Sequence, residues 1–226
     1  MTIQHSPTTN SLWNLDGNGR GKPLPWLAGQ DVPQEPGLFW LHLNYSDAQA
    51  RDWLLRSDLL GKPVAEALLD EATRPRVLHH GTGLLLTLRG VNLNPGAEPE
   101  DMVSIRLWIE ENRIISTRKR RLRSVKEIQS MLEAGEGPRS SGEFLAMLLK
   151  LMTDNIGAVI EELEDRMAEV EEQIVAHHGA KAREALADLR RQAIALRRYL
   201  APQREALSRL SAERVPWMIP DDHFRI

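Results

Sequence analysis

The sequence predicts an α+β fold, an α/β/α sandwich with a mixed sheet followed by two long antiparallel helices. Strand and helix signals alternate over the first two thirds of the chain, which is typical of helices packed on the faces of a sheet. Two amphipathic stretches then fill residues 141–176 and 180–213. Each would be about 50 Å long at 1.5 Å per residue, whereas a compact domain of this length has a radius of only about 17 Å. The two helices are therefore expected to project from the globular part or to serve an assembly.

The sandwich is expected to begin with a strand at residues 12–15 that ends in the turn Asp16-Gly17-Asn18-Gly19. Residues 37–44 (GLFWLHLN) form the strongest strand signal in the chain. Successive side chains of a strand point to opposite faces, and both faces of this one are mostly apolar. The strand should therefore be central in the sheet and covered on both sides.

Two helices and a meander of strands are expected next. Ser46 or Asp47 can cap the first helix, and Pro63 at a first-turn position opens the second. Glu111-Asn112 is a plausible two-residue hairpin turn. The expected strands are residues 76–80, 83–92, 102–110 and 113–118, and a short helix at 124–134 and the linker 134–141 (AGEGPRSS) follow them.

The apolar positions of the long helices predict which faces are buried. In the first helix an eleven-residue repeat favours a straight or slightly right-handed course; the expected inward residues are Leu145, Leu148, Met152, Ile156, Val159, Leu163, Met167, Val170 and Ile174. In the second helix Gln203 breaks a seven-residue spacing, and Pro202 is expected to interrupt the backbone hydrogen bonding. Its expected inward residues are Leu186, Leu189, Ala193, Leu196, Leu200, Leu207 and Leu210.

The two long helices carry opposite charge. Nine acidic residues and two cations lie between Glu143 and Glu172, whereas eight basic residues and four acids lie between Lys181 and Glu213. An exposed ion pair contributes only roughly a few tenths of a kcal/mol. We therefore expect the apolar residues to stabilise the hairpin and the charges to fix its pairing and register. The acid-rich face is either simply solvated or directed toward an ion-accessible space shared in an oligomer.

Composition excludes several classes of protein. The chain has no cysteine, so it has neither disulfides nor thiolate metal sites. It contains no run of about 18 apolar residues, the length that spans a bilayer. A net charge of −3 does not select nucleic acid as a partner. No Ser-His-Asp or paired-carboxylate arrangement has a credible context, so we expect no enzyme, and Trp40, Trp53 and Trp108 are expected in the core.

Six stretches and the long helices after them resemble one family in the same order. The stretches are residues 12–17 (LWNLDG), 39–45 (FWLHLNY), 53–54 (WL), 69–76 (LDEATRPR), 85–94 (LLTLRGVNLN) and 103–121 (VSIRLWIEENRIISTRKRR). The chain resembles the cytoplasmic region of CorA-type metal ion transporters and is most similar to their zinc-transporting branch, ZntB. The similarity covers nearly all of residues 11–226.

The resemblance implies a homopentameric funnel on the cytoplasmic side of the bacterial inner membrane, with Zn²⁺ as the transported ion and no required cofactor. The chain is expected to divide into a disordered tail (1–10), the sandwich (11–136) and the helical hairpin (141–213), and the resemblance implies that residues 214–226 start a stalk. The family's Gly-Met-Asn channel signature is absent from these residues. Contact with the membrane is therefore expected only through transmembrane helices after Ile226. A soluble scaffold that binds a partner helix through its helical hairpin is the alternative.

A basic cluster follows the last expected strand. Seven cations and no acid lie between Arg113 and Lys126, and the helix N-terminus near Ser124 adds positive potential and free backbone amides. An anion such as chloride, sulfate or phosphate is expected to bind Arg118, Lys119, Arg120, Arg121 and Arg123. The alternative is a solvated basic loop, or arginines that pair with acids of a neighbouring subunit.

Two short segments are candidates for a metal site. His177 and His178 lie at the expected tip of the hairpin, where a symmetric assembly or Glu172 could complete a zinc site. Asp221, Asp222 and His223 offer oxygen and nitrogen ligands near the expected stalk. The alternatives are helix-end histidines that bind backbone carbonyls and, at residues 221–223, a helix-capping turn.

Overall fold

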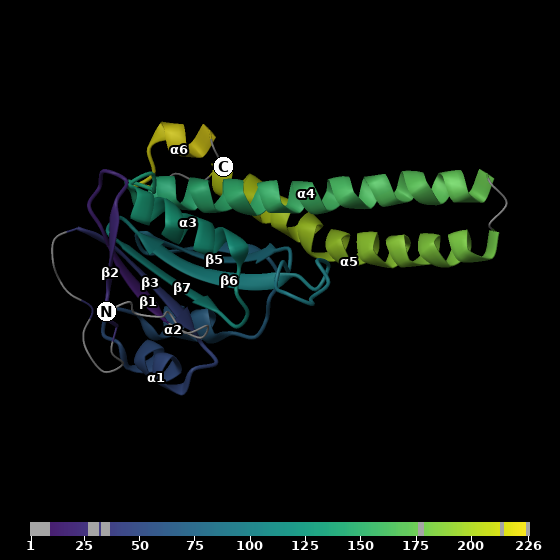
Figure 1. The fold of residues 1–226 in the computed structure, drawn as a ribbon. Helices are drawn as coiled ribbons and strands as arrows, with labels where there is room; N and C mark the ends of the chain where they lie inside the picture. Colours follow the sequence, from purple (N-terminus) through teal and green to yellow (C-terminus); the bar gives the residue numbers. More distant parts are fainter. Residues whose placement is uncertain (1–9, 27–31, 33–36, 176–178, 213–214, 225–226) are drawn as a thin grey trace, which may run out of the picture.

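The computed structural model describes residues 10–26, 32, 37–175, 179–212 and 215–224. A sheet lies between two helical layers, and two long helices extend well beyond it (Figure 1). The strands are β1 (Ser11–Leu15), β2 (Gly21–Leu24), β3 (Leu38–Asn44), β4 (Arg76–His80), β5 (Gly83–Gly90), β6 (Val103–Glu110) and β7 (Arg113–Arg118). The helices are α1 (Ala48–Arg56), α2 (Lys62–Leu69), α3 (Arg123–Ala134), α4 (Ser141–Val175), α5 (Gly179–Ala212) and α6 (Pro220–Phe224). The predicted fold class is confirmed.

The strands form one mixed sheet in the order β2-β1-β3-β7-β6-β5-β4. Strands β3 and β7 pair in parallel, and the other pairings are antiparallel. The carboxyl ends of β3, β7 and β5 therefore lie at the same end of the sheet. Strand β2 was not predicted, because its sequence Gly-Lys-Pro-Leu has no strand pattern. It is an edge strand, where a proline breaks no ladder between two neighbours.

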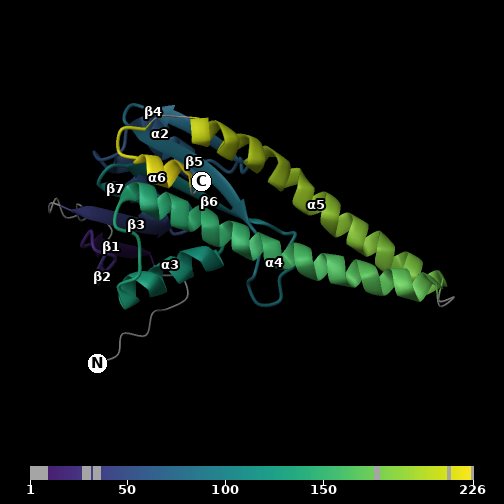
Figure 2. The ribbon, with the colours of Figure 1, turned by 90° about the horizontal axis from the view of Figure 1, so that it is seen from above.

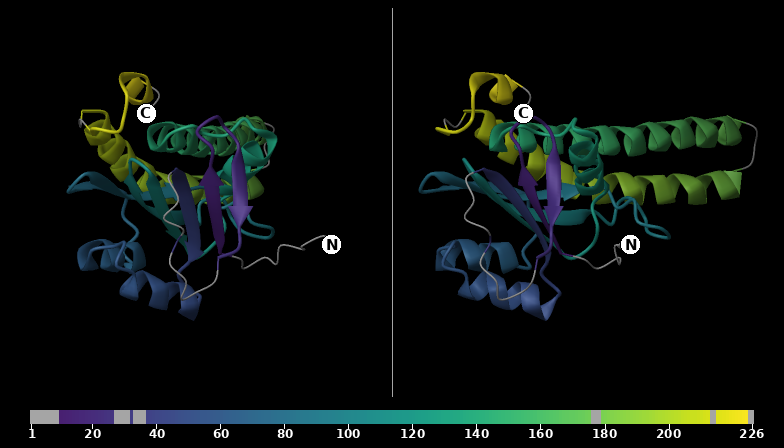
Figure 3. Two further views of the ribbon diagram at one scale, coloured as in Figure 1. Left: turned by 90° about the vertical axis from the view of Figure 1, so that its left-hand side faces the viewer. Right: turned by 60° about the vertical axis from the view of Figure 1, so that its left-hand side comes forward.

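Strand β3 has the two buried faces that its sequence predicts. Trp40 is fully buried on the side of α3 and α4, and its ring lies 4.8 Å from that of Phe144 in α4. Leu41 and Leu43 are fully buried on the opposite side, among residues of α1 and α2. Figure 3 shows the sheet between these two layers. Trp53 and Trp108 are buried in the α1/α2 layer, so the prediction of core tryptophans is confirmed.

The local signals at helix ends also behave as predicted. The Asp47 carboxylate caps α1 and accepts a hydrogen bond from the backbone N–H of Gln49 at 3.0 Å. Pro63 lies in the first turn of α2. Gly135 ends α3 in the left-handed conformation (φ 82°), which glycine adopts without the usual steric penalty. The backbone N–H of Gly137 then donates to the carbonyl of Gly19 at 2.8 Å, so the linker folds back onto the sheet and starts α4 against it.

The first half of α4 belongs to the core of the sandwich. Its buried apolar residues are Phe144, Leu145, Leu148, Leu149 and Met152, which pack in one cluster with β3, β5, β6 and α3. The helix has 35 residues, which corresponds to about 50 Å. Its second half therefore runs past the end of the sheet, as Figures 1 and 2 show.

Beyond Leu163, α4 packs on α5 along a narrow apolar seam. The buried residues near the tip are Val170, Ala182 and Leu189. Ile174 is 46% exposed, Leu186 is 38% exposed and Ala193 is exposed, so their predicted inward placement is wrong. A helix with a single neighbour buries only the side chains that face that neighbour, and the predicted stripes were wider than this contact.

Charges contribute little to the pairing of α4 and α5 among the described side chains. Ion pairs such as Lys150–Asp154 (2.5 Å) and Arg191–Asp188 lie within one helix. Between the two helices, Arg166 Nη1 donates to Gln192 Oε1 at 3.0 Å. The apolar seam therefore provides most of the contact, and a role of the opposite charges in pairing and register stays a prediction.

Gln203 breaks the spacing of α5 because it bonds the sheet. Strand β4 begins at Arg76, opposite Thr87 of β5, so Arg89 has no strand partner on that side. The buried Gln203 amide replaces it: Oε1 accepts from the Arg89 N–H at 2.6 Å, and Nε2 donates to the Arg89 carbonyl at 3.0 Å. Helix α5 is continuous across Pro202.

Residues 215–224 return to the start of α4. Val215 and Met218 are buried in the same core as Phe144. Trp217 Nε1 donates to the carbonyl of Thr82 at 2.8 Å. The segment that precedes the end of the chain is thus fixed to the sandwich rather than to the projecting part of the hairpin.

Candidate functional site

The predicted basic cluster lies at the end of the sheet where the carboxyl ends of β3 and β7 meet. Arg118 is the last residue of β7, and Lys119, Arg120 and Arg121 begin the connection to α3. These four cations line one wall of an open hollow of about 520 Å³. The rest of the wall comes from the end of β3 and from the β5–β6 loop: Asn44, Asn92, Asn94, Gly96, Ala97 and Asp101.

Arg118 differs from its neighbours because it is held from inside the core. Only 7% of it is exposed, and its Nε donates to Nε2 of the buried His42 at 3.0 Å. Since an arginine Nε always carries hydrogen, Nε2 of His42 must be the acceptor and Nδ1 must carry the imidazole hydrogen. Nδ1 then donates to Ser116 Oγ at 2.7 Å, which also accepts from Trp40 Nε1 at 2.8 Å.

Burial shifts the pKa values of both His42 and Arg118. The loss of hydration, followed by the positive charge of Arg118, lowers the pKa of His42 to about 3, so the ring is neutral at neutral pH. Burial also lowers the pKa of Arg118 from its usual value, and the nearby Arg121 lowers it further. Arg118 thus keeps a charge that its surroundings disfavour.

Arg123 lies apart from the other four predicted residues. It is in the first turn of α3, where its Nε bonds Glu127 Oε1 at 3.0 Å one turn along the helix. It does not line the hollow, whereas Arg118, Lys119, Arg120 and Arg121 do. The sequence cluster therefore divides into four residues around one space and one residue paired with a carboxylate elsewhere.

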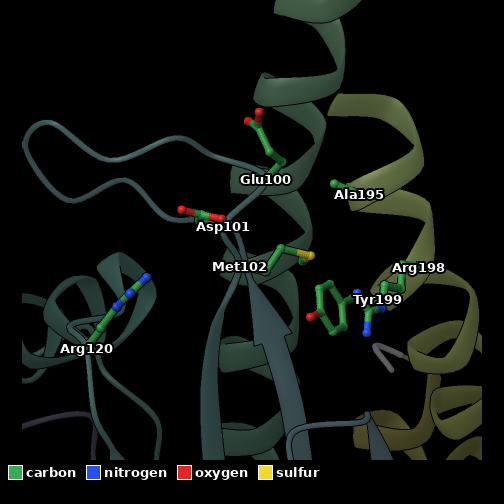
Figure 4. Close-up of a pocket in the computed structure, with 7 residues that line it drawn as sticks. All are labelled: Glu100, Asp101, Met102, Arg120, Ala195, Arg198 and Tyr199. Carbon is green, nitrogen blue, oxygen red and sulfur yellow. The ribbon is translucent and has the colours of Figure 1, made fainter. Parts of the chain in front are cut away.

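Two smaller hollows adjoin the first and share its residues. One, of about 300 Å³, is lined by Tyr45, Glu71, Thr73, Arg89, Val103, Ser104, Lys119 and Arg120. The other, of about 270 Å³, lies between the β5–β6 loop and α5 (Figure 4), and its lining is Glu100, Asp101, Met102, Arg120, Ala195, Arg198 and Tyr199. Arg120 lines all three spaces, so it is the residue on which they converge.

Two buried arginines near these spaces were not predicted. Arg89 donates from Nε to the Thr73 carbonyl at 3.0 Å, bonds the Thr73 hydroxyl and the Met102 carbonyl, and lies 4.2 Å from the centre of the Tyr199 ring. Arg106 is fully buried, lies 4.9 Å from the centre of the Tyr45 ring, and none of its side-chain nitrogens has a hydrogen-bond acceptor among the described residues. A charged residue within an apolar strand, as in LLTLRG and VSIRLWI, is the signal that could have identified both.

The predicted metal ligands do not come together in the part of the chain that the structure describes. His177 and His178 lie outside the described residues, as does the side chain of His223. Asp221 is exposed, whereas Asp222 is 3% exposed and accepts a hydrogen bond from the Ile219 N–H at 3.4 Å. The described residues contain no group of three or more His, Asp or Glu side chains that could hold a metal ion. Metal binding by these five residues stays a prediction.

Asp222 instead has a structural position at the start of α4. A Cβ added to Gly142, the second residue of α4, would lie 2.1 Å from Asp222 Oδ2. A carboxylate at this position interacts favourably with the positive end of the helix dipole. This arrangement fits the helix-capping interpretation of residues 221–223.

Among the helices of the described ranges, none combines the length and the apolar character needed to cross a bilayer.

Comparison with known proteins is consistent with this architecture. A family model described as CorA-like Mg²⁺ transporter protein matches residues 35–226. The zinc transport protein ZntB of Klebsiella pneumoniae is 39% identical over 220 residues, which are 97% of this chain and 66% of that protein. The chain thus spans about two thirds of the length of the curated relatives it matches.

Solved structures show the same fold. The full-length CmaX protein has a TM-score of 0.88 at 38% identity over 98% of this chain and 69% of that one. The ZntB cytoplasmic domain of Vibrio parahaemolyticus has a TM-score of 0.80 at 23% identity, over 95% of this chain and 85% of that one. Because the family model covers most of the chain, from residue 35 to residue 226, the chain belongs to the family of CorA-like Mg²⁺ transporter proteins.

Proposed function

We propose that this chain is the cytosolic funnel domain of a homopentameric divalent-cation transporter, with Zn²⁺ as the transported ion. In this proposal the membrane-spanning part belongs to a longer protein that contains the chain. The choice of zinc over magnesium depends on the name of the Klebsiella pneumoniae relative, a zinc transport protein at 39% identity. The domain transports nothing by itself, and its role is to shape the path and the ion concentration below the pore.

The observation that carries the proposal is the projecting half of the α4–α5 hairpin. Its seam is thin, and five large apolar residues remain exposed on it: Ile160, Ile174, Val175, Leu186 and Ile194. A long helical pair that leaves such residues in water is under-stabilised as a single chain, because burial of apolar surface is the main source of stability. Adjacent copies of the chain would cover these residues if their hairpins lie side by side around an axis.

The acidic residues of α4 suit the wall of an ion path. Those of its projecting half are all exposed: Glu161, Glu162, Glu164, Asp165, Glu169, Glu171 and Glu172. A ring of such helices would combine their negative charge around one space and raise the local concentration of cations. Basic residues on α5 would face the acids of a neighbouring copy and favour a single relative orientation.

Reconstitution of the complete protein tests the proposal. The full reading frame that contains this chain is placed in liposomes, and entry of Zn²⁺ is followed with an enclosed fluorescent indicator. We expect zinc flux that exceeds Mg²⁺ flux, and light scattering of the detergent-solubilised protein that gives five subunits. A pentamer without zinc flux would contradict the assignment of the ion, and a monomer without flux of any divalent cation would contradict the transporter itself.

A further inference from the structure

The hollow of about 520 Å³ beside residues 118–121 has features of a binding site that the transporter proposal does not use. Four cations from consecutive positions, Arg118 to Arg121, line it against a single carboxylate, that of Asp101. The loop that carries Asp101 is tied to the same wall, because Asn94 Nδ2 donates to the Arg121 carbonyl at 3.1 Å. The positive charge is therefore concentrated in a defined concave space rather than spread over a convex surface.

The Arg118 side chain is preorganised to bind a ligand in this hollow. Its Nε is engaged by His42, and His42 is fixed by Ser116 and Trp40. No hydrogen bond joins Nη1 or Nη2 to a described residue, and Arg118, which is 7% exposed as a whole residue, lines the hollow. A guanidinium held in this way donates to two oxygens of a phosphate or carboxylate without losing side-chain freedom.

The surrounding groups indicate the class of anion. Several cations around one space favour an anion with more than one negative charge and several oxygens. The amides of Asn44, Asn92 and Asn94 on the other wall offer donors and acceptors to a polar body.

We propose that the hollow at residues 118–121 binds the phosphoryl group of a small soluble phosphorylated compound. The dianionic phosphoryl group lies against Arg118 and Arg120, and the polar remainder lies along the asparagine side. This site is separate from the transported ion, so it can exist whether or not the complete protein carries zinc.

The test uses the 226-residue chain and calorimetric titration with inorganic phosphate and pyrophosphate in a buffer without chloride. Lys119 and Arg120 are exposed, so Arg120→Gln is expected to leave the fold intact. It should weaken binding about tenfold or more, the effect of losing one charge-assisted hydrogen bond. Arg123→Gln is the matched control, because Arg123 lies three residues after Arg120, carries the same charge and pairs with Glu127. Its substitution should change the affinity less than about twofold.

Four results would overturn the proposal. They are the absence of saturable phosphate binding, equal weakening by Arg120→Gln and Arg123→Gln, displacement of phosphate by an equal concentration of chloride, and binding to phosphatidylglycerol vesicles without binding to free phosphate. The second indicates a general charge effect, the third a site for monovalent ions, and the fourth a membrane surface. Saturable binding that only Arg120→Gln weakens supports it.

Discussion

The two halves of helix α4 have different surroundings although they belong to one continuous helix. The first half packs on the sheet, on α3 and on the returning segment, and Phe144, Leu145 and Leu148 are fully buried. The second half packs mainly on α5 and leaves Ile160, Ile174 and Val175 exposed. The first half is therefore stable through the chain's own core, whereas the second requires a further partner. This difference connects the fold to the proposed assembly.

Deleting a core side chain from the first half should have the largest effect. Leu148→Ala should lower the free energy of unfolding of the isolated chain by about 3 kcal/mol, because Leu148 is fully buried and the sheet cannot collapse into the cavity. Leu163→Ala in the second half should lower it by less than about 1 kcal/mol, because Leu163 is only partly buried. Chemical denaturation followed by circular dichroism measures both, and equal losses would show that the two halves do not differ.

The amide of Gln203 should contribute the next largest effect, because it marks the point where α5 leaves the sheet. Gln203→Leu should cost about 2 kcal/mol, since it leaves the buried N–H and carbonyl of Arg89 without partners. Gln192→Leu is the control on the projecting part of the same helix, where the lost bond to Arg166 is only partly buried. It should cost less than about 1 kcal/mol in the same denaturation experiment. A larger loss for Gln192→Leu would reverse the comparison.

The sandwich should also be sensitive to acid through His42. The pKa of His42 is about 3 in the folded chain, below the usual value of about 6.5, so the unfolded chain binds a proton that the folded chain does not. Stability is therefore fully present above about pH 6.5 and falls as the pH drops toward 3, by about 2 kcal/mol at pH 5. Unfolding measured between pH 7 and 5 checks this, and His42→Gln should flatten the slope. An unchanged slope in that variant would assign the effect to other groups.

Exposed apolar residues should give the smallest effect in the isolated chain. Ile194→Lys, at a position that is 60% exposed on the projecting hairpin, should change the free energy of unfolding by less than about 0.5 kcal/mol. The same variant should prevent assembly of the complete protein, as measured by light scattering, if adjacent copies cover this surface. Leu55→Lys, at a position that is 55% exposed on α1, is the control and should leave assembly intact. Loss of assembly in both variants, or in neither, would argue against an interface on the hairpin.

The sequence predicts the parts of the fold that depend on local patterns. The strand at β3, the cap at Asp47 and the unbroken helices α4 and α5 follow from alternation, capping chemistry and helical periodicity within short windows. Strand β2 has no such pattern and forms only because β1 is beside it. Ile174 and Leu186 fit the periodicity but are exposed, because a stripe on a helix does not show how many neighbours the helix has.

The sequence predicts only part of the candidate site. Arg118, Lys119, Arg120 and Arg121 are adjacent in the chain, so their charge is evident as a cluster. Arg118 differs from the other three through its hydrogen bond to His42, which lies 76 positions away in the sequence. The hydrogen bond between Gln203 and Arg89 joins residues 114 positions apart. Such pairs depend on strand order, which a single sequence does not specify.

Amide hydrogen exchange along α4 tests the central claim most directly, because it reports the stability of each half separately. The exchange is measured in the isolated chain and in the complete assembled protein. We predict that amides of residues 144–156 exchange only through global unfolding in both samples, whereas those of residues 163–174 exchange quickly in the isolated chain and become protected in the assembly. Equal protection of the two halves in the isolated chain, or no gain for residues 163–174 on assembly, would contradict the account.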